Sequence, residues 1–160
     1  MKPEQYFFRY AWPCTEVLLE KKKVSQQRFN DLKFAANNNI IPLRNVLEDT
    51  YKTAFENLKN IAKAMKKDHW DISVIKRYFD EGEHNNFINS GKGEFGHAPE
   101  SLKDMCRVHE GVIDSINKGF IRVEYDNERK ARMCMNPYKI KLKPGDRVKI
   151  HYGYVIEKII

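Results

Sequence analysis

The sequence has no long hydrophobic run and few cysteines. No segment approaches the ~20 consecutive apolar residues that a membrane-spanning helix needs, and the first ten residues lack the apolar centre of a secretory signal. The three cysteines, Cys14, Cys106 and Cys134, form an odd and sparse set, unlike the dense, even framework of a small secreted domain. We therefore expect a cytoplasmic protein with no membrane partner, whose thiols are free, buried or metal-ligating.

The signatures of several common enzyme sites are also absent. The sequence contains no Gly-x-x-x-x-Gly-Lys phosphate loop, no dinucleotide fingerprint after a strand and no Gly-x-Ser-x-Gly elbow. Nothing in the sequence therefore requires an enzyme, and we expect a non-enzymatic protein. The 160 residues, of which 41% are hydrophobic, are sufficient for one domain or two small ones with a real core.

Apolar residues in the first ninety positions recur at helical spacing. Pro42 suits the start of a helix, and the apolar side chains then fall every three or four residues, at Leu43, Leu47, Tyr51, Ala54, Phe55, Leu58, Ile61, Ala62 and Met65. Ser25 can cap a helix before this stripe, and Asp68 or Asp71 can cap one after it. The pattern predicts a helical bundle over residues 1–90.

The period of the apolar residues changes after a glycine-rich segment. Residues 91–104, which begin with three glycines and one proline in nine positions, are the expected linker. Beyond them, apolar and polar residues alternate in short runs such as Ile121–Tyr125 and Val148–Tyr152, which is typical of strands. We predict an α+β protein in which residues 105–160 form a small β-barrel behind the bundle.

Two segments of the predicted barrel carry a family resemblance. Residues 105–113 read Met-Cys-Arg-Val-His-Glu-Gly-Val-Ile, and residues 143–158 contain a Gly-Asp pair, a valine-rich strand, the sequence His-Tyr-Gly-Tyr and an apolar-Glu-Lys ending. These features resemble the start and the end of the HypC/HupF hydrogenase-maturation chaperones. The resemblance covers about the last third of the chain, so the helical part would be an N-terminal extension.

The resemblance implies an OB-like β-barrel that catalyses no reaction itself. It implies that the barrel transiently carries Fe(CN)2CO, the iron fragment of a nickel–iron hydrogenase, while bound to the hydrogenase large-subunit precursor or another maturation protein. The functional cysteine and histidine of the family fall on Cys106 and His151. A thiolate is a soft ligand for low-spin iron, and a nearby imidazole can ligate, tune the thiol or take its proton. The spacing Cys-x-x-His adds His109 as a further candidate metal ligand.

Each candidate also has a purely structural interpretation. Cys106 could be a small buried hydrophobic residue, and His151 a hydrogen-bonded histidine of a strand. Cys134, between two methionines, is expected to pack in the core. Cys14 lies near a predicted helix start, where the helix dipole could lower its pKa, but a packed thiol is the favoured interpretation.

A basic stretch supports a different function. Residues 105–160 carry 12 basic and 7 acidic side chains, against 17 and 15 in residues 1–104, and basic β-barrels with aromatic residues bind RNA or single-stranded DNA. The alternative is therefore a nucleic-acid or acidic-partner surface, made by Arg129, Lys130, Arg132, Lys139, Lys141, Lys143 and Lys149. Alternation places Lys139, Lys141 and Lys143 on one face of an expected strand. Without a nucleic-acid role, these lysines would form a solvated strand edge that resists aggregation.

Overall fold

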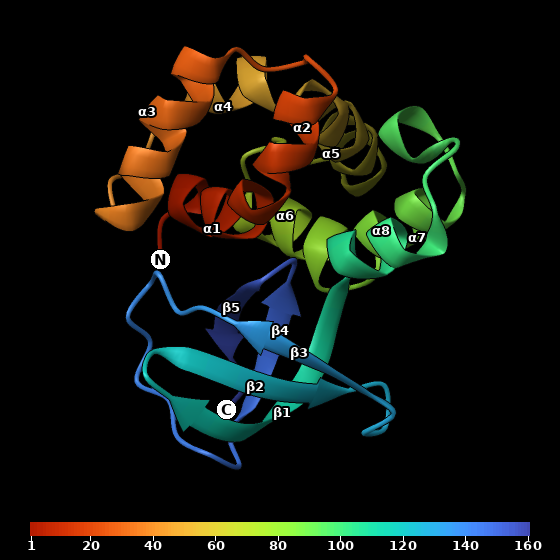
Figure 1. Ribbon diagram of the computed structural model, residues 1–160. Helices are drawn as coiled ribbons and strands as arrows, with labels where there is room; N and C mark the ends of the chain where they lie inside the picture. Colours follow the sequence, from red (N-terminus) through yellow and green to blue (C-terminus); the bar gives the residue numbers. More distant parts are fainter.

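Helices and strands occupy opposite halves of the molecule (Figure 1). The structure is a computed structural model that describes residues 1–160, apart from the side chain of Glu94. The α-helices are α1 (Pro3–Ala11), α2 (Thr15–Glu20), α3 (Gln26–Asn37), α4 (Arg44–Thr50), α5 (Lys52–Met65), α6 (Ile72–Phe79), α7 (Glu83–Asn89) and α8 (Glu100–Cys106), with short 3-10 helices η1 (Trp12–Cys14) and η2 (Gly93–Phe95). The strands are β1 (Val108–Asn117), β2 (Phe120–Tyr125), β3 (Lys130–Cys134), β4 (Arg147–His151) and β5 (Tyr154–Lys158). None of the described helices combines the length and apolar character that crossing a membrane requires.

The helical stripe predicted after Pro42 is divided between α4 and α5. The chain leaves helical geometry at Tyr51, whose φ of −105° and ψ of 50° end α4 just before α5 begins. Leu47, Phe55 and Leu58 are buried as the spacing predicts, whereas Leu43 is exposed because it precedes the first turn of α4. Two of the predicted caps are confirmed: the Ser25 side chain accepts a hydrogen bond from a first-turn N–H of α3, and that of Asp71 from one of α6.

The strands form one antiparallel sheet in the order β3-β2-β1-β4-β5. The long strand β1 pairs with two strands. Its residues 108–112 pair with β4, and its residues 111–117 pair with β2 around a bulge after Ile113. A single parallel bridge between Met135 and Tyr154 links the end of β3 to β5. The mixed helix-and-sheet class is confirmed, and the sheet is open rather than a closed barrel.

Gly111 lies where β1 exchanges one neighbour for the other. A Cβ atom there would stand 2.6 Å from the carbonyl oxygen of Glu124 and 2.6 Å from a side-chain carbon of Val123. Real side chains do not approach the backbone that closely, so only glycine lets β1 and β2 meet at this point. The glycine in the Met-Cys segment is therefore a structural requirement of the sheet.

Two local expectations were wrong. Residues 91–104, expected as a linker, carry η2 and most of α8, so Cys106 ends a helix and lies before the first strand of the sheet. Residues 139–143 form a loop, although their apolar residues are partly buried against the sheet core. The side chain of Asn136 bonds both the N–H and the C=O of Ile140, and Asp146 bonds the N–H of Lys143. These local bonds take the backbone groups that a sheet ladder would use.

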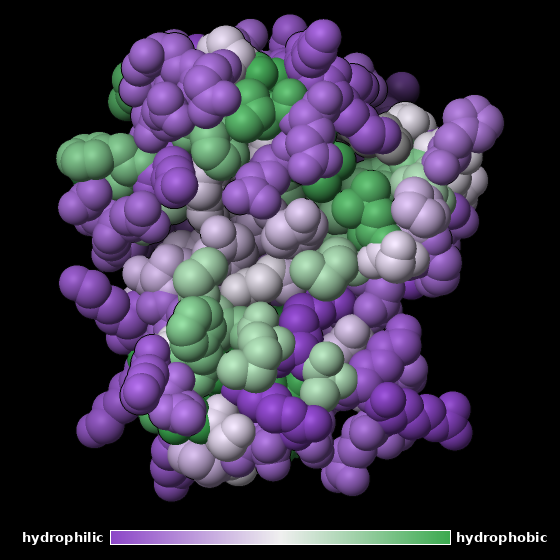
Figure 2. Space-filling model, in the orientation of Figure 1, coloured by the Kyte–Doolittle hydropathy of each residue, from purple (hydrophilic) through white to green (hydrophobic). Residues whose placement is uncertain are grey.

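The helical half and the sheet share buried contacts. Ile156 of β5 is fully buried in the core of the helical half, and Cys106 packs with Val17 and Ile88 in a small cluster at the junction. The hydroxyl of Tyr138 donates to the carbonyl of Arg9 at 3.0 Å. Figure 2 shows pale and green atoms across the middle of the molecule, between two mostly hydrophilic ends. The sheet is thus held against the helices by a continuous contact.

Candidate thiol–histidine site

Three chain segments meet where the sheet touches the helices. Cys14 ends η1 and is the N-cap residue of α2, Cys106 is the last residue of α8, and His151 is the last residue of β4. His151 pairs with Val108 across the ladder, and the N–H of Tyr152 donates to the carbonyl of Met105 at 2.8 Å. The register of β1 and β4 thereby fixes the end of α8 beside His151. We call Cys14, Cys106 and His151 the thiol–histidine site.

The closest contact in the thiol–histidine site joins Cys14 to His151. The Sγ atom of Cys14 lies 2.9 Å from Nε2 of His151, and Nδ1 of the same ring lies 2.7 Å from the carbonyl oxygen of Tyr10. A carbonyl only accepts hydrogen bonds, so Nδ1 carries the proton and donates it to Tyr10. In the neutral ring Nε2 is then an acceptor, and the thiol of Cys14 donates to it.

Both histidines at this junction are held in the neutral form. Burial, with a smaller contribution from the nearby His84, lowers the pKa of His151 to about 3, against the opposing effect of the backbones of Tyr10 and Cys106. Burial also lowers the pKa of His84 to about 4. The two rings meet edge to face with centroids 5.2 Å apart. Near pH 7, His151 therefore presents a free-base imidazole to Cys14.

The thiol of Cys106 meets the thiol of Cys14. A hydrogen bond donated by Cys14 to the thiolate holds the pKa of Cys106 below its usual value, with help from Arg132 and Lys21 against burial. Since Cys14 has one thiol proton, it donates either to His151 or to an ionised Cys106. The same contact, together with burial, raises the pKa of Cys14. The pKa of Cys14 is therefore raised and not lowered, because the neighbouring thiol and burial outweigh the dipole of the short helix α2. Cys106 is the member of the pair that ionises more readily.

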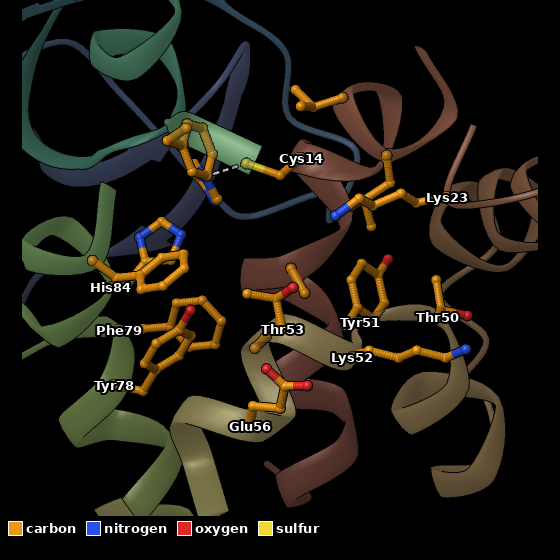
Figure 3. A pocket seen from close by; sticks show the side chains of 17 residues that line it. Cys14, Lys23, Thr50, Tyr51, Lys52, Thr53, Glu56, Tyr78, Phe79 and His84 are labelled. Carbon is orange, nitrogen blue, oxygen red and sulfur yellow. Dashed lines mark hydrogen bonds between the residues drawn. The ribbon is translucent and has the colours of Figure 1, made fainter. Parts of the chain in front are cut away.

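A cavity of about 420 Å³ borders the thiol–histidine site. Cys14 and His84 lie toward one side of it, and Lys23 and Tyr51 lie toward the other (Figure 3). His151 also lines the cavity. Most of the remaining wall is apolar or aromatic and comes from α2, α5, α6 and α7. Cys14 is half-buried at this wall, whereas Cys106 is fully buried behind it. A ligand in the cavity would therefore meet Cys14 before Cys106.

His109 belongs to a different group of side chains. It follows Val108, the partner of His151, so its side chain lies on the opposite face of β1. There its Nε2 atom lies 2.9 Å from the carbonyl oxygen of Asp104, and its ring stacks on Tyr125 with centroids 4.7 Å apart. We call this group, with its charged members, the Asp104 cluster: Asp104, His109, Tyr125, Lys130 and Arg132. The structure brings Cys106 and His151 together and places His109 elsewhere.

The basic residues predicted to bind nucleic acid do not share one role. Lys130 and Arg132 pair with Asp104, at 3.0 and 3.2 Å, and Lys149 pairs with Asp80 at 2.8 Å. Each of the three therefore has a carboxylate partner within the protein, although Lys130 and Arg132 share one and Lys130 remains exposed. The remaining four are exposed: Arg129, Lys139, Lys141 and Lys143. A nucleic-acid or acidic-partner surface stays a prediction, for which the exposed members of the set are available.

The third cysteine has the structural role expected from the sequence. Cys134 is fully buried in the core of the sheet, and burial raises its pKa to about 11. It lies in a different hydrophobic cluster from Cys106. Cys134 therefore offers a matched control for experiments on the other two thiols.

The thiol–histidine site is not a ready-made metal centre. Within the described side chains, no group of three or more His, Cys, Asp or Glu is already arranged to hold an ion. Comparisons with protein-family models, with curated proteins and with solved structures find no match to this chain. The site is therefore interpreted from its own residues and their contacts.

Proposed function

We propose that this protein is a non-enzymatic binding protein of the HypC type, which carries the iron fragment Fe(CN)2CO of a nickel–iron hydrogenase. One observation carries the proposal. The two residues selected by the sequence resemblance, Cys106 and His151, come from distant parts of the chain and lie at one junction, linked through the thiol of Cys14. We expect the cargo to bind there while the protein is docked to the hydrogenase large-subunit precursor or another maturation protein.

The electrostatics of the junction suit a soft, low-spin iron centre. Thiolates and imidazoles are the ligands that soft and borderline metals prefer. The lowered pKa of Cys106 favours its thiolate, and the neutral His151 keeps a lone pair on Nε2. Cys106 stands in mid-chain at the end of α8, so its backbone nitrogen is a peptide and binding must rely on the side chains.

The strand arrangement supports the finer proposal of an OB-like barrel. The long, bulged β1 is shared by two neighbours, and the bridge from Met135 to Tyr154 brings the two edges of the sheet toward each other. An OB-like barrel is a five-stranded, partly open structure in which such sharing is expected. The helical half then covers the end of the barrel that holds His151.

Infrared spectroscopy tests the proposed cargo directly. We would co-express the protein with an active nickel–iron hydrogenase maturation system, purify it without oxygen and record the CO and CN stretching bands. Bands on the wild type and on Cys134→Ala, but none on Cys106→Ala, are the expected result. Removing one small thiol is expected to cost only about 1–2 kcal/mol of stability, so the variant should stay folded. The absence of bands on the wild type would refute the proposed function.

A further inference from the structure

We infer that Cys14, supplied by the helical half, is a metal ligand together with Cys106 and His151. The site would then take a soft divalent transition-metal centre through two thiolates and one imidazole. The inference depends on the proposed function only for the identity of the metal fragment. It assigns a chemical role to the helical extension, whose segment η1 delivers Cys14 to the sheet.

The spacing of Cys14 and His151 matches two neighbouring ligands of one metal ion. Metal–sulfur and metal–nitrogen bonds of about 2.3 and 2.0–2.1 Å, at a right angle, place the two donor atoms ~3.1 Å apart. The observed separation of Sγ and Nε2 is 2.9 Å. Right angles are those of octahedral and square-planar centres. A small displacement would admit the metal once the thiol proton has left.

The orientation of His151 is that of a ligand histidine. Histidines that bind metals usually donate their second ring N–H to a carbonyl or a carboxylate, which fixes the tautomer and directs the free nitrogen at the metal. Here the carbonyl of Tyr10 accepts from Nδ1 at 2.7 Å. Tyr10 and Cys14 belong to the same stretch of chain, so one segment both orients the imidazole and supplies the adjacent thiol.

Cys106 completes the set through its contact with Cys14. The three donors do not yet surround a common point, so we expect the Cys106 side chain to turn when the metal enters. Two thiolates neutralise a divalent cation, and the neutral imidazole adds no charge. The complete site would therefore be uncharged, which suits its buried position better than a lone ion would.

A nucleophilic thiol is the main chemical alternative, because a thiol beside an imidazole is also the arrangement of a nucleophile and its base. Burial opposes it: the transfer of a proton from Cys14 to His151 would create two charges, one on a half-buried thiol and one on a fully buried imidazole. A metal cation avoids this cost because it replaces the proton and balances the thiolates. The arrangement thus favours ligation over nucleophilic attack.

Cobalt binding tests the number of thiolates. Metal-free protein would be titrated with Co2+ under anaerobic conditions, and the thiolate-to-cobalt charge-transfer absorbance recorded for the wild type, Cys14→Ser, Cys106→Ser and the control Cys134→Ser. Each of the first two variants should show about half the absorbance per bound ion, because one of two thiolates is lost, and at least ~10-fold weaker binding. The control should match the wild type. An unchanged signal in Cys14→Ser would overturn the inference.

A measurement on the wild type avoids any effect of substitution on folding. Cys14 is half-buried at the cavity, so prolonged incubation with iodoacetamide should alkylate it through its small thiolate fraction in the metal-free protein, and one equivalent of Co2+ should protect it, as read by mass spectrometry. Equal alkylation of Cys14 with and without bound Co2+ would contradict its role as a ligand.

Infrared bands on Cys14→Ser at wild-type intensity would leave the proposed function intact while removing Cys14 from the site. Conversely, the wild type could bind Co2+ through two thiolates and yet show no CO or CN bands. That result would refute the proposed function and leave Cys14 as a metal ligand.

Discussion

Two polar groups flank the start of β1, and they differ in how their charges are balanced. In the Asp104 cluster, the Asp104 carboxylate accepts hydrogen bonds from Tyr125, Lys130 and Arg132, at 2.8, 3.0 and 3.2 Å. The thiol–histidine site contains no carboxylate and no cation. Its members are two thiols and one imidazole, joined by hydrogen bonds between neutral or weakly acidic groups.

The difference separates an ion-paired network from a site whose donor atoms have no charged partner. Within the Asp104 cluster the positive and negative groups satisfy one another, so His109 has little to offer a ligand. In the thiol–histidine site, Nε2 of His151 and the two sulfurs keep lone pairs that no cation uses, and a cavity lies beside them. His109 of β1 and His151 of β4 thus differ in their capacity to bind a ligand, because their side chains lie on opposite faces of the sheet.

Removing Asp104 should produce the largest change and should affect stability alone. Asp104→Ala would leave Arg132, whose side chain is 7% exposed, as a buried cation without its partner. We expect a loss of about 2–4 kcal/mol in the free energy of unfolding, measured with urea. The matched control is Asp114→Ala, which breaks an exposed pair with Arg122 and should cost less than about 1 kcal/mol. Equal losses in the two variants would show that the Asp104 cluster is not a buried network.

The next comparison removes each of the two histidines in turn. His151→Ala should weaken Co2+ binding at least ~10-fold, because a ligand and its orienting hydrogen bond are lost together. His109→Ala should leave the Kd for Co2+ within about twofold, since His109 contacts only the Asp104 cluster. Isothermal titration calorimetry at equal protein concentration gives both values. A larger effect from His109 than from His151 would reverse the assignment.

Much of the fold was predictable from the sequence, because local patterns determine it. The spacing of Leu47, Phe55 and Leu58 indicated a buried helical face, and the alternation in residues 121–125 and 148–152 indicated strands. The loop at residues 139–143 was mistaken for a strand because its apolar residues alternate. Its backbone bonds go to Asn136 and Asp146 instead, and alternation alone does not reveal such side-chain partners.

The thiol–histidine site was only partly predictable. Cys106 and His151 came from the resemblance of the sheet region, but Cys14 did not, because its position depends on how η1 packs against the end of β4. The sequence offered one weak signal, a cysteine directly after Trp12-Pro13 at a helix start. Only the packing of the two halves shows that this thiol meets His151.

A smaller effect is expected from Tyr10→Phe, which separates the hydrogen bonds of the Tyr10 hydroxyl from the role of its carbonyl in the site. The Tyr10 hydroxyl bonds Glu157 at 2.5 Å and Asp80 at 3.1 Å, whereas its carbonyl orients His151. Tyr10→Phe removes only the hydroxyl, so we expect a loss of about 1 kcal/mol in unfolding free energy and an unchanged Kd for Co2+. Urea unfolding and calorimetry provide the two readouts. A large loss of Co2+ affinity would mean that the hydroxyl, too, holds His151 in place.

The smallest effects are expected from the exposed lysines. Reversing Lys139, Lys141 and Lys143 to Glu should leave stability and Co2+ binding nearly unchanged, because the three side chains are exposed in a loop. If the nucleic-acid alternative holds, the wild type should bind a single-stranded RNA probe in fluorescence anisotropy, with an affinity that falls steeply as salt rises, and the triple variant should not. No binding by the wild type at low ionic strength would remove that alternative.

The burial of Ile156 in the helical half has a consequence for biosynthesis. The helices leave the ribosome first, yet their core lacks one buried residue until β5 has been made. The same strand pair brings His151 to Cys14, so the three donors meet only after the sheet has docked. If the proposed metal site is correct, a nascent chain cannot capture a metal at the full site, and loading would have to follow the completion of folding.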